Sequence, residues 1–329
     1  MLIYSTERRV TRPSSKGSVG GFADRVKGIT FTYYLAKLIG REFAIEWRQP
    51  DQLEESFAFP KFQGITEDFQ HTSIDMIDKN FTQEIKLDFL NNQAQRFTDQ
   101  YNEKDIIKIN CNSLPLDVLH ANQVFFNKLG LPTKTYSEIF KYIFDTILIY
   151  RPQQFFQNLQ NEFNSFLDKT FTIGVQFRLG GDANGWDDPV IDSTKNITNL
   201  IEAIKRIATE RGIEKYNVYI TSDSHTARNA IIQRLNESGK EAFYLDFDPI
   251  HIDKQNASTT NSDVTFVYFD NYLLSQCDLI VVGQGFFGRL AAYRTGKTPY
   301  YYRDFCAEVT KDYNDDALLS KIFNWIKRR

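Results

Sequence analysis

The amino-acid sequence predicts an α/β fold with parallel sheets, and three observations lead to that class. Apolar runs of about four to seven residues alternate with longer segments of helical period, most regularly after residue 170. Glycine-rich turns stand where several of these runs end and a helix begins. With 329 residues, the chain is also longer than one hydrophobic core usually supports. Because strand–helix alternation builds parallel βαβ units, we expect two doubly wound domains.

The first 47 residues hold one such unit. Residues 2–5 form a short apolar strand, and a polar loop follows it. Gly20 and Gly21 then open a helix whose apolar positions follow the helical period up to Gly40. Residues 43–47 form the next strand, which completes the order strand, glycine turn, helix, strand.

The middle of the chain is less regular and is expected to be rich in helix. Short strands are expected over residues 73–77 and 105–110, between polar loops. Helices are expected over residues 123–129, 136–150 and 153–167, where apolar side chains recur every three or four positions.

The second half of the chain repeats the alternation. Strands are expected over residues 171–177, 217–221, 242–246, 279–282 and 299–302. Helices are expected between them, over residues 196–211, 226–237, 264–275 and 286–295, and an amphipathic helix is expected over residues 315–329. These patterns indicate an N-terminal domain of residues 1–168, a C-terminal domain of residues 169–311, and a closing helix within residues 312–329.

Composition excludes several classes of protein. The net charge is −3 and the basic residues are scattered, so no electrostatic footprint for nucleic acid is present. Three cysteines without CxxC spacing are typical of core thiols in a reducing compartment. The N-terminus does not resemble a signal peptide, and no transmembrane segment is expected, because no window approaches 18 apolar residues. We therefore expect a cytoplasmic protein, with peripheral contact to a membrane left open.

Three strand ends of the second half carry complementary chemistry: a cation, a carboxylate, and a helix start opened by glycines. Parallel strands present their carboxyl ends to one edge of a sheet, where open α/β folds bind ligands, so these loops can converge. They contain Arg178, Gly180, Gly181 and Asp182 after the first strand, Ser222 and Asp223 after the second, and Gly285, Phe286, Phe287 and Gly288 after the fourth. Backbone N–H groups at such a helix start favour anions, and an arginine fork suits diphosphate.

Each of these residues also has a purely structural explanation. Arg178 could pair with Asp182 or Asp188, and Asp223 could serve as a helix N-cap. The glycines could form tight turns with nothing bound.

The N-terminal glycine turn combines the same kinds of residue as these loops, glycines and charged side chains at the start of a helix. Gly20 and Gly21 leave the backbone free to approach a ligand, and Asp24 and Arg25 follow on the first helical turn. Glu46, at the end of its strand, could face the same cleft. The structural alternatives are close helix packing for the two glycines, a surface ion pair between Asp24 and Arg25, and an exposed acid at a strand end for Glu46.

Other chemistries have little support in the sequence. It contains neither a P-loop, nor HExxH, nor GxSxG, and the glycines near residue 20 do not match a dinucleotide-binding GxGxxG. The four histidines have no metal-ligand spacing, and paired aspartates such as Asp187 and Asp188 are weak metal candidates. No metal and no cofactor are therefore predicted.

Three segments resemble the fucosyltransferase superfamily of GT-B glycosyltransferases. They are GGFADRVKGITFTYYLAKLIGREFAIEW at residues 20–47, IGVQFRLGGD at residues 173–182, and CDLIVVGQGFFGRLAAYRTGKTPYYY at residues 277–302. The resemblance implies two Rossmann-like domains that face each other across a cleft, with the nucleotide-sugar donor on the C-terminal one and the acceptor on the N-terminal one. By the same resemblance the closing helix could pack back on the first domain. By the same resemblance Arg178 contacts the diphosphate, Asp223 the guanine, and the backbone of residues 285–288 the phosphates.

The resemblance also implies an activity, which is inverting, metal-independent transfer of a 6-deoxyhexose, fucose from GDP-fucose, to a glycan hydroxyl. Asp24, where many relatives have asparagine, is the first choice for the general base, followed by Asp182 and Glu46. Gln176 departs from the family pattern, in which histidine is common, so a donor such as another NDP-sugar or a CMP-sugar stays open. A non-catalytic nucleotide-sugar or glycan-binding protein is the alternative from a different class.

Overall fold

A computed structural model describes residues 1–6, 20–47, 53–61, 71–75, 105–112, 135–181, 190–250, 252 and 260–306. Two expected helices, over residues 123–129 and 315–329, and the candidate Asp182 lie outside these described residues.

The C-terminal sheet is built as the alternation predicts. Its strands are β7 (Phe171–Phe177), β8 (Tyr216–Ser222), β9 (Ala242–Phe243), β10 (Leu279–Val282) and β11 (Tyr300–Tyr301). All neighbours pair in parallel, in the order β11-β10-β7-β8-β9. The chain runs outward from β7 to β9 and then returns to the other side of β7. The order therefore reverses between β7 and β10, and such a switch point is where doubly wound sheets bind ligands.

Helices cover both faces of this sheet. On one face, α8 (Ile197–Glu210) and α9 (His225–Glu237) pack on side chains such as Val175 and Val218. On the other face lie α7 (Gln157–Leu167), α10 (Asn261–Gln276) and α11 (Phe287–Arg294), which pack on side chains such as Tyr219 and Val282. Because both faces are covered, the strands are nearly continuous apolar runs. The structure shows that α7, although it precedes residue 169, packs on the C-terminal sheet; the domain limits themselves stay a prediction.

The N-terminal sheet has four parallel strands in the order β2-β1-β5-β4. They are β1 (Leu2–Ser5), β2 (Phe43–Glu46), β4 (His71–Asp75) and β5 (Ile106–Asn110). Helix α1 (Phe22–Leu38) lies close on the sheet at Gly28, where a Cβ atom would stand 1.8 Å from the Cys111 carbonyl oxygen and 2.5 Å from the Tyr4 ring. Only glycine allows this approach, so α1 is held at a fixed height above the sheet.

Two sequence predictions are wrong in detail. The helix expected over residues 136–150 ends earlier: α6 (Tyr136–Thr146) is followed by β6 (Ile149–Tyr150), which pairs antiparallel with β3 (Phe57–Ala58). This pairing joins residues about 90 positions apart, so no local pattern could reveal it. The strand expected over residues 242–246 shortens to β9 at the edge of the sheet. Four short 3₁₀ turns complete the described elements: η1 (Leu53–Glu55), η2 (Gln154–Phe156), η4 (Thr194–Asn196) and η5 (Tyr302–Phe305).

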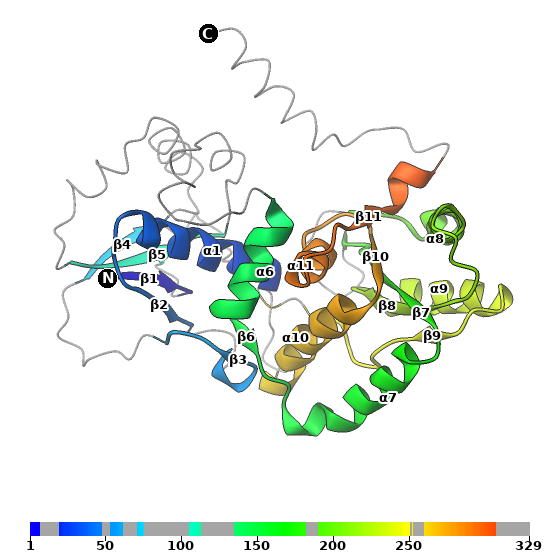
Figure 1. Cartoon of the computed structure of the whole chain (residues 1–329), viewed down its shortest axis with the longest axis horizontal. Helices are drawn as coiled ribbons and strands as arrows, with labels where there is room; N and C mark the ends of the chain where they lie inside the picture. Colours follow the sequence, from blue (N-terminus) through cyan, green and yellow to red (C-terminus); the bar gives the residue numbers. More distant parts are fainter. Residues whose placement is uncertain are drawn as a thin grey trace, which may run out of the picture.

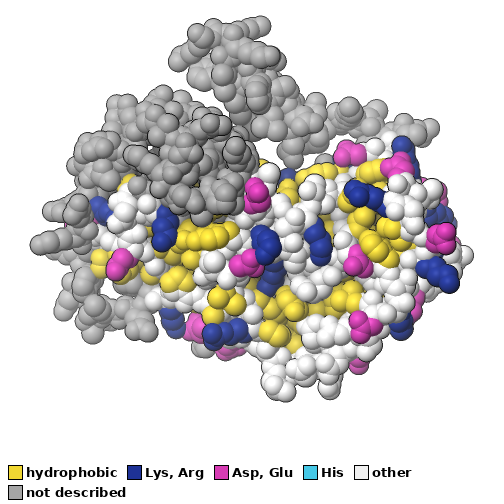
Figure 2. Space-filling view, viewed as in Figure 1, with side chains coloured by type: hydrophobic (Ala, Val, Ile, Leu, Met, Phe, Trp, Pro, Cys, Tyr) yellow, Lys and Arg dark blue, Asp and Glu magenta, His cyan; other side chains and the backbone are white. Residues whose placement is uncertain are grey.

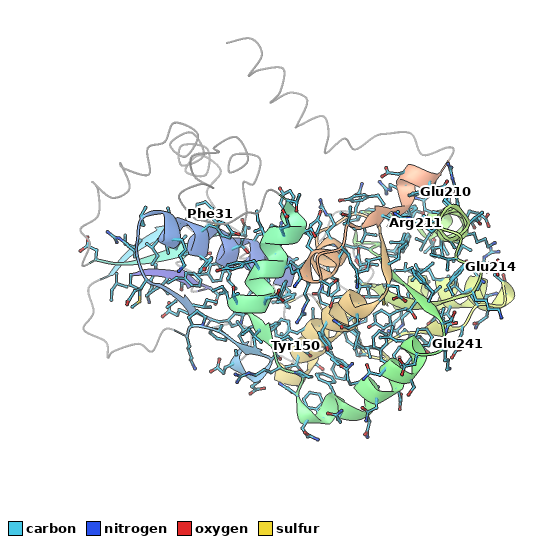
Figure 3. The ribbon with its side chains drawn as sticks, viewed as in Figure 1. Phe31, Tyr150, Glu210, Arg211, Glu214 and Glu241 are labelled. Atoms are coloured by element: carbon cyan, nitrogen blue, oxygen red, sulfur yellow. The ribbon has the colours of Figure 1, made fainter. Side chains whose placement is uncertain are left out.

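The two sheets share an apolar junction built from helices. Figure 1 shows α6, α11 and α10 between the strands of the two sheets. One core cluster contains residues of both halves: the Phe22 ring lies 4.8 Å from that of Tyr268, and the Phe140 ring lies 5.5 Å from that of Phe286. Tyr150, labelled in Figure 3, belongs to the same junction. The N-terminal ends of α1 and α11 are thereby brought together.

Candidate active site

The three loops at the carboxyl ends of β10, β7 and β8 meet around Arg178. Its Nε atom lies 3.7 Å from the Oδ2 atom of Asp223, which follows β8. On the other side, a Cβ atom added to Gly285 would stand 3.5 Å from the Cδ atom of Arg178. The strands are direct neighbours in the sheet, so the convergence predicted from the common direction of parallel strands is present. Arg178 thus occupies the switch point, with its side chain 29% exposed.

Asp223 fixes the backbone of the turn that carries Arg178. Its Oδ1 atom accepts a hydrogen bond from the backbone N–H of Leu179 at 2.7 Å, and its Oδ2 atom accepts one from Gly180 at 2.9 Å. Gly180 and Gly181 adopt φ angles of 65° and 72°, a left-handed region that favours glycine. Asp223 therefore has a positioning role that the sequence did not reveal, and its assignment to a nucleobase stays a prediction.

The N-cap of α9 is Ser224, whose hydroxyl accepts a hydrogen bond from the backbone N–H of Ala227 at 3.3 Å. The structural alternative considered for Asp223, an N-cap, is therefore excluded. The Ser222 hydroxyl accepts a hydrogen bond from the Ser224 backbone N–H at 3.2 Å, so Ser222 supports the same turn.

The loop before α11 leaves a helix N-terminus open. Gly285 adopts a φ angle of 101°, and Phe286 is an N-cap without a side-chain hydrogen bond to the helix. The first backbone N–H groups of any helix lack acceptors within the helix, and they carry its positive end. Gly288 serves packing, because a Cβ atom there would stand 2.7 Å from the Cβ atom of Gln176. The Asn271 side chain holds the helix start by donating to the Phe287 carbonyl at 3.0 Å.

The N-terminal glycine turn is held by Arg25. Its Nε atom donates to the Gly20 carbonyl at 2.9 Å, and its guanidinium lies 5.0 Å from the centre of the Trp47 ring system. Gly20 adopts a φ angle of 86°, and a Cβ atom there would stand 2.5 Å from the Cβ atom of Asp24. Gly21 is the N-cap of α1. Arg25 is buried and supports the turn, and its predicted contact with a ligand stays a prediction.

Asp24 faces the junction between the two halves. Its Oδ1 atom accepts a hydrogen bond from the Lys27 ammonium at 2.5 Å, and its side chain is 40% exposed. The same ammonium lies 4.5 Å from the centre of the Phe286 ring. One lysine therefore links the predicted acceptor side to the predicted phosphate loop. The sequence offered only its i, i+3 spacing from Asp24 as a signal, and that spacing is common on helix surfaces.

Three cations gather around Gly285 and Phe286 at the positive end of α11. Arg178 touches Gly285, Lys27 lies over the Phe286 ring, and Arg289 lies 4.9 Å from the centre of that ring while its Nε donates to the Gly285 carbonyl at 2.9 Å. Cations at a helix N-terminus are repelled by its dipole, so this arrangement is favourable with an anion present. Diphosphate has the charge and the oxygen atoms to satisfy it.

Glu46 is engaged inside the N-terminal sheet. Its side chain is 9% exposed, Oε2 accepts a hydrogen bond from the Ser5 hydroxyl at 2.7 Å, and Oε1 accepts one from the Lys108 ammonium at 3.0 Å. Both carboxylate oxygens thus already accept hydrogen bonds from side chains of the protein. Among the predicted carboxylates that the structure describes, Asp24 and Asp223 are the two that reach the junction of loops.

A buried carboxylate lies behind the site, on α10. Asp270 accepts hydrogen bonds from the hydroxyls of Tyr219, at 2.5 Å, and Thr221. Burial raises the pKa of Asp270 to about 6, against the opposing effect of these two hydroxyls and of the nearby Arg228. The hydroxyls come from β8, so their hydrogen bonds tie α10 to the strand that Asp223 follows.

Other parts of the described surface carry weaker signals. No group of three His, Cys, Asp or Glu side chains suited to a metal ion occurs among the described residues. A hollow lined by Lys205, Thr209 and Lys240 lies at the amino-terminal edge of the C-terminal sheet, opposite the loops above. The face seen in Figure 2 intersperses basic and acidic side chains without a broad patch of either sign. Across the described residues, no helix is both long and apolar enough to span a membrane.

No family model and no curated protein sequence matches this chain. Solved structures do match it in fold. A mutant of Arabidopsis thaliana FUT1 in complex with GDP aligns with a TM-score of 0.57 and 14% identity, over 91% of this chain and 69% of that one. POFUT1 in complex with GDP-fucose aligns with a TM-score of 0.51 and 12% identity, over 91% of this chain and 96% of that one. The chain has the GT-B-like fold of these fucosyltransferases. The predicted fold class is thereby confirmed, and at these identities the likeness concerns the fold.

Proposed function

We propose that this protein is a glycosyltransferase that uses a nucleotide-sugar donor. The observation that carries the proposal is the convergence of Arg178 and Arg289 on the open N-terminus of α11, at the switch point of the C-terminal sheet. A diphosphate leaving group needs charge stabilisation above all, and this position supplies it from fixed groups. The fold likeness to enzymes solved with GDP and GDP-fucose supports the same class of donor.

The donor we propose is GDP-fucose, and the reaction is inverting transfer of fucose to a glycan hydroxyl. The acceptor oxygen attacks the anomeric carbon, the bond from that carbon to the diphosphate oxygen breaks, and its electron pair leaves with GDP. Asp24 takes the acceptor proton, because it is the described candidate base with an exposed carboxylate at the junction. Arg178 and the α11 N-terminus stabilise the charge on the departing diphosphate, a role that protein cations fill without a metal ion. We place the reaction in the cytoplasm.

Two alternatives keep the same site. Another NDP-sugar or a CMP-sugar would bind with its phosphates at α11 and a different base beside β8. A non-catalytic protein would bind the nucleotide sugar or glycan without turnover.

A nucleotide panel followed by a turnover assay separates these cases. Thermal shift and calorimetry with GDP, UDP, CDP, ADP and CMP report the base, and release of GDP from GDP-fucose with a glycan array reports transfer. Preference for GDP together with acceptor-dependent GDP release is the expected result. Preference for another nucleotide would favour the second donor class, and binding without donor hydrolysis or transfer would favour the non-catalytic protein. Absence of binding by every nucleotide would contradict the proposal as a whole.

A further inference from the structure

Lys27 is the feature of the junction that the reaction above does not use. It lies on the second turn of α1, with its side chain 20% exposed. Its ammonium forms one ion pair, with Asp24 at 2.5 Å, and one aromatic contact, with Phe286 at 4.5 Å from the ring centre. Phe286 belongs to the other half of the chain, directly before α11. Lys27 is thus a cation of the N-terminal half placed at the phosphate loop of the C-terminal half.

The hydrogen-bonding capacity of this lysine exceeds what its described surroundings take up. An ammonium group has three N–H donors. Among the described residues, Asp24 is its single hydrogen-bond acceptor, and the Phe286 ring offers a cation–π contact instead. Lys27 therefore has N–H donors beyond those that its described contacts use, at the helix start that Arg178 and Arg289 also contact.

A second observation at the same helix start points to a ligand. Gln176, the residue before Phe177 on β7, runs beneath the first turn of α11, as its Cβ and Cγ atoms lie 2.7 Å and 3.2 Å from the Cβ position of Gly288. The side chain is buried, with 4% of the residue exposed, and its Oε1 atom has no hydrogen-bond partner among the described residues. A buried amide oxygen normally accepts a hydrogen bond, so an unsatisfied one on the side chain beneath the start of α11 favours a site occupied by a group that donates, such as a ligand hydroxyl.

We propose that Lys27 binds the diphosphate of the donor, so that the N-terminal half supplies part of the donor site. The inference rests on the proposed function and names a residue within it. Asp24 then has a positioning role as well, because its ion pair directs the ammonium of Lys27 toward Phe286. The donor site is complete only where the N-terminal ends of α1 and α11 meet.

The test compares ligands with and without phosphates. Lys27→Met keeps the apolar stem over Phe286 and removes the charge, Lys27→Arg keeps the charge, and Lys37→Met is the control. Lys37 lies on the same helix and over an aromatic ring, 5.5 Å from the centre of Tyr33, far along the helix from α11. Calorimetry measures the dissociation constants of GDP and of guanosine for each protein.

Lys27→Met is expected to weaken GDP binding about tenfold, as loss of one charge-assisted contact does, and to leave guanosine binding unchanged. Lys27→Arg should stay within about threefold of wild type, since it retains the charge. Equal GDP affinity of wild type and Lys27→Met would overturn the proposal, and so would a matching loss for guanosine, which would reveal a structural role. Failure of the wild-type protein to bind GDP would instead refute the proposed donor.

Discussion

The two ends of α11 each place a cation of one half against aromatic rings of the other, and they do so in opposite ways. At the N-terminal end, Lys27 lies over Phe286 and is partly exposed beside Asp24. At the C-terminal end, Arg294 is 7% exposed, and its guanidinium lies within 6.0 Å of four ring centres, those of Phe57, Phe144 and Tyr150 from the N-terminal half and that of Tyr272 from its own half.

Electrostatics explains the difference between these ends. The C-terminal end of a helix is its negative end, so Arg294 is favoured there, and aromatic faces offset part of its lost hydration. Burial lowers the pKa of Arg294 to about 10, which leaves it charged at neutral pH. Among the described residues no carboxylate pairs with it. The C-terminal end of α11 thus holds the two halves together, whereas cations at the N-terminal end oppose the helix dipole and suit an anionic ligand.

The largest effect is expected at the C-terminal end of α11. Arg294→Ala should reduce the free energy of unfolding by about 4 kcal/mol, because it opens a cavity between four rings and removes their cation. Arg294→Met, which fills more of the space, should cost about half as much. Urea unfolding measures both. Unchanged stability of Arg294→Ala would show that the aromatic cage does not hold the halves together.

At the N-terminal end of α11, a substitution is expected to change ligand binding and to leave the stability of the fold nearly unchanged. Arg178→Ala should weaken GDP binding about 100-fold, since it removes the forked donor at the switch point, and should leave the free energy of unfolding within about 0.5 kcal/mol. Arg206→Ala is the control, because Arg206 is 57% exposed and pairs with Glu210 on α8. Calorimetry and urea unfolding on the same samples test both statements. Near-normal binding and transfer by Arg178→Ala would remove the basis of the proposed function.

The smallest effect is expected for Asp270, in the interior behind the site, and it is a pH dependence of the free energy of unfolding. The pKa of Asp270 is about 6 in the folded protein and about 3.8 ordinarily, so the folded state holds this proton more tightly. Its contribution to stability is therefore fully present below about pH 4 and is lost as pH rises through 6, by about 1 kcal/mol between pH 5 and pH 7.

Asp270→Asn should remove that part of the pH dependence, whereas Asp304→Asn, at an exposed carboxylate, should not. The measurement is urea unfolding from pH 5 to pH 7. A slope that Asp270→Asn leaves intact would assign the titration to another group. Nucleotide affinity should not follow this slope, which would separate the interior from the N-terminal end of α11.

Sequence predicted the C-terminal half better than the junction between halves. The limits of β7 and β10 are as predicted, and Gly285 lies beside Arg178 as strand order requires. These features depend on local period, glycine conformation and the common direction of parallel strands. The N-terminal glycine turn was also placed correctly, although Arg25 proved to be one of its internal supports.

Two residues of the candidate site have partners far along the chain, which no local sequence pattern predicts. Glu46 was a candidate base that could face the cleft, and Lys108, 62 positions later, forms an ion pair with it within the sheet. Lys27 was not among the predicted site residues, because its partner Phe286 belongs to the other half of the chain and reaches it through the packing of the two halves. The antiparallel pair of β3 and β6 was missed for the same reason.

The sequence alone determined the α/β class, the strand and glycine positions of the C-terminal sheet and the place of Arg178 at its edge, because each follows from side-chain period and backbone freedom over a few residues. Tertiary structure decided which charged side chains gather at the α11 N-terminus and which are enclosed. That outcome depends on pairings between residues far apart in the chain, and the free energy of such pairings comes from burial and close packing that no short segment specifies.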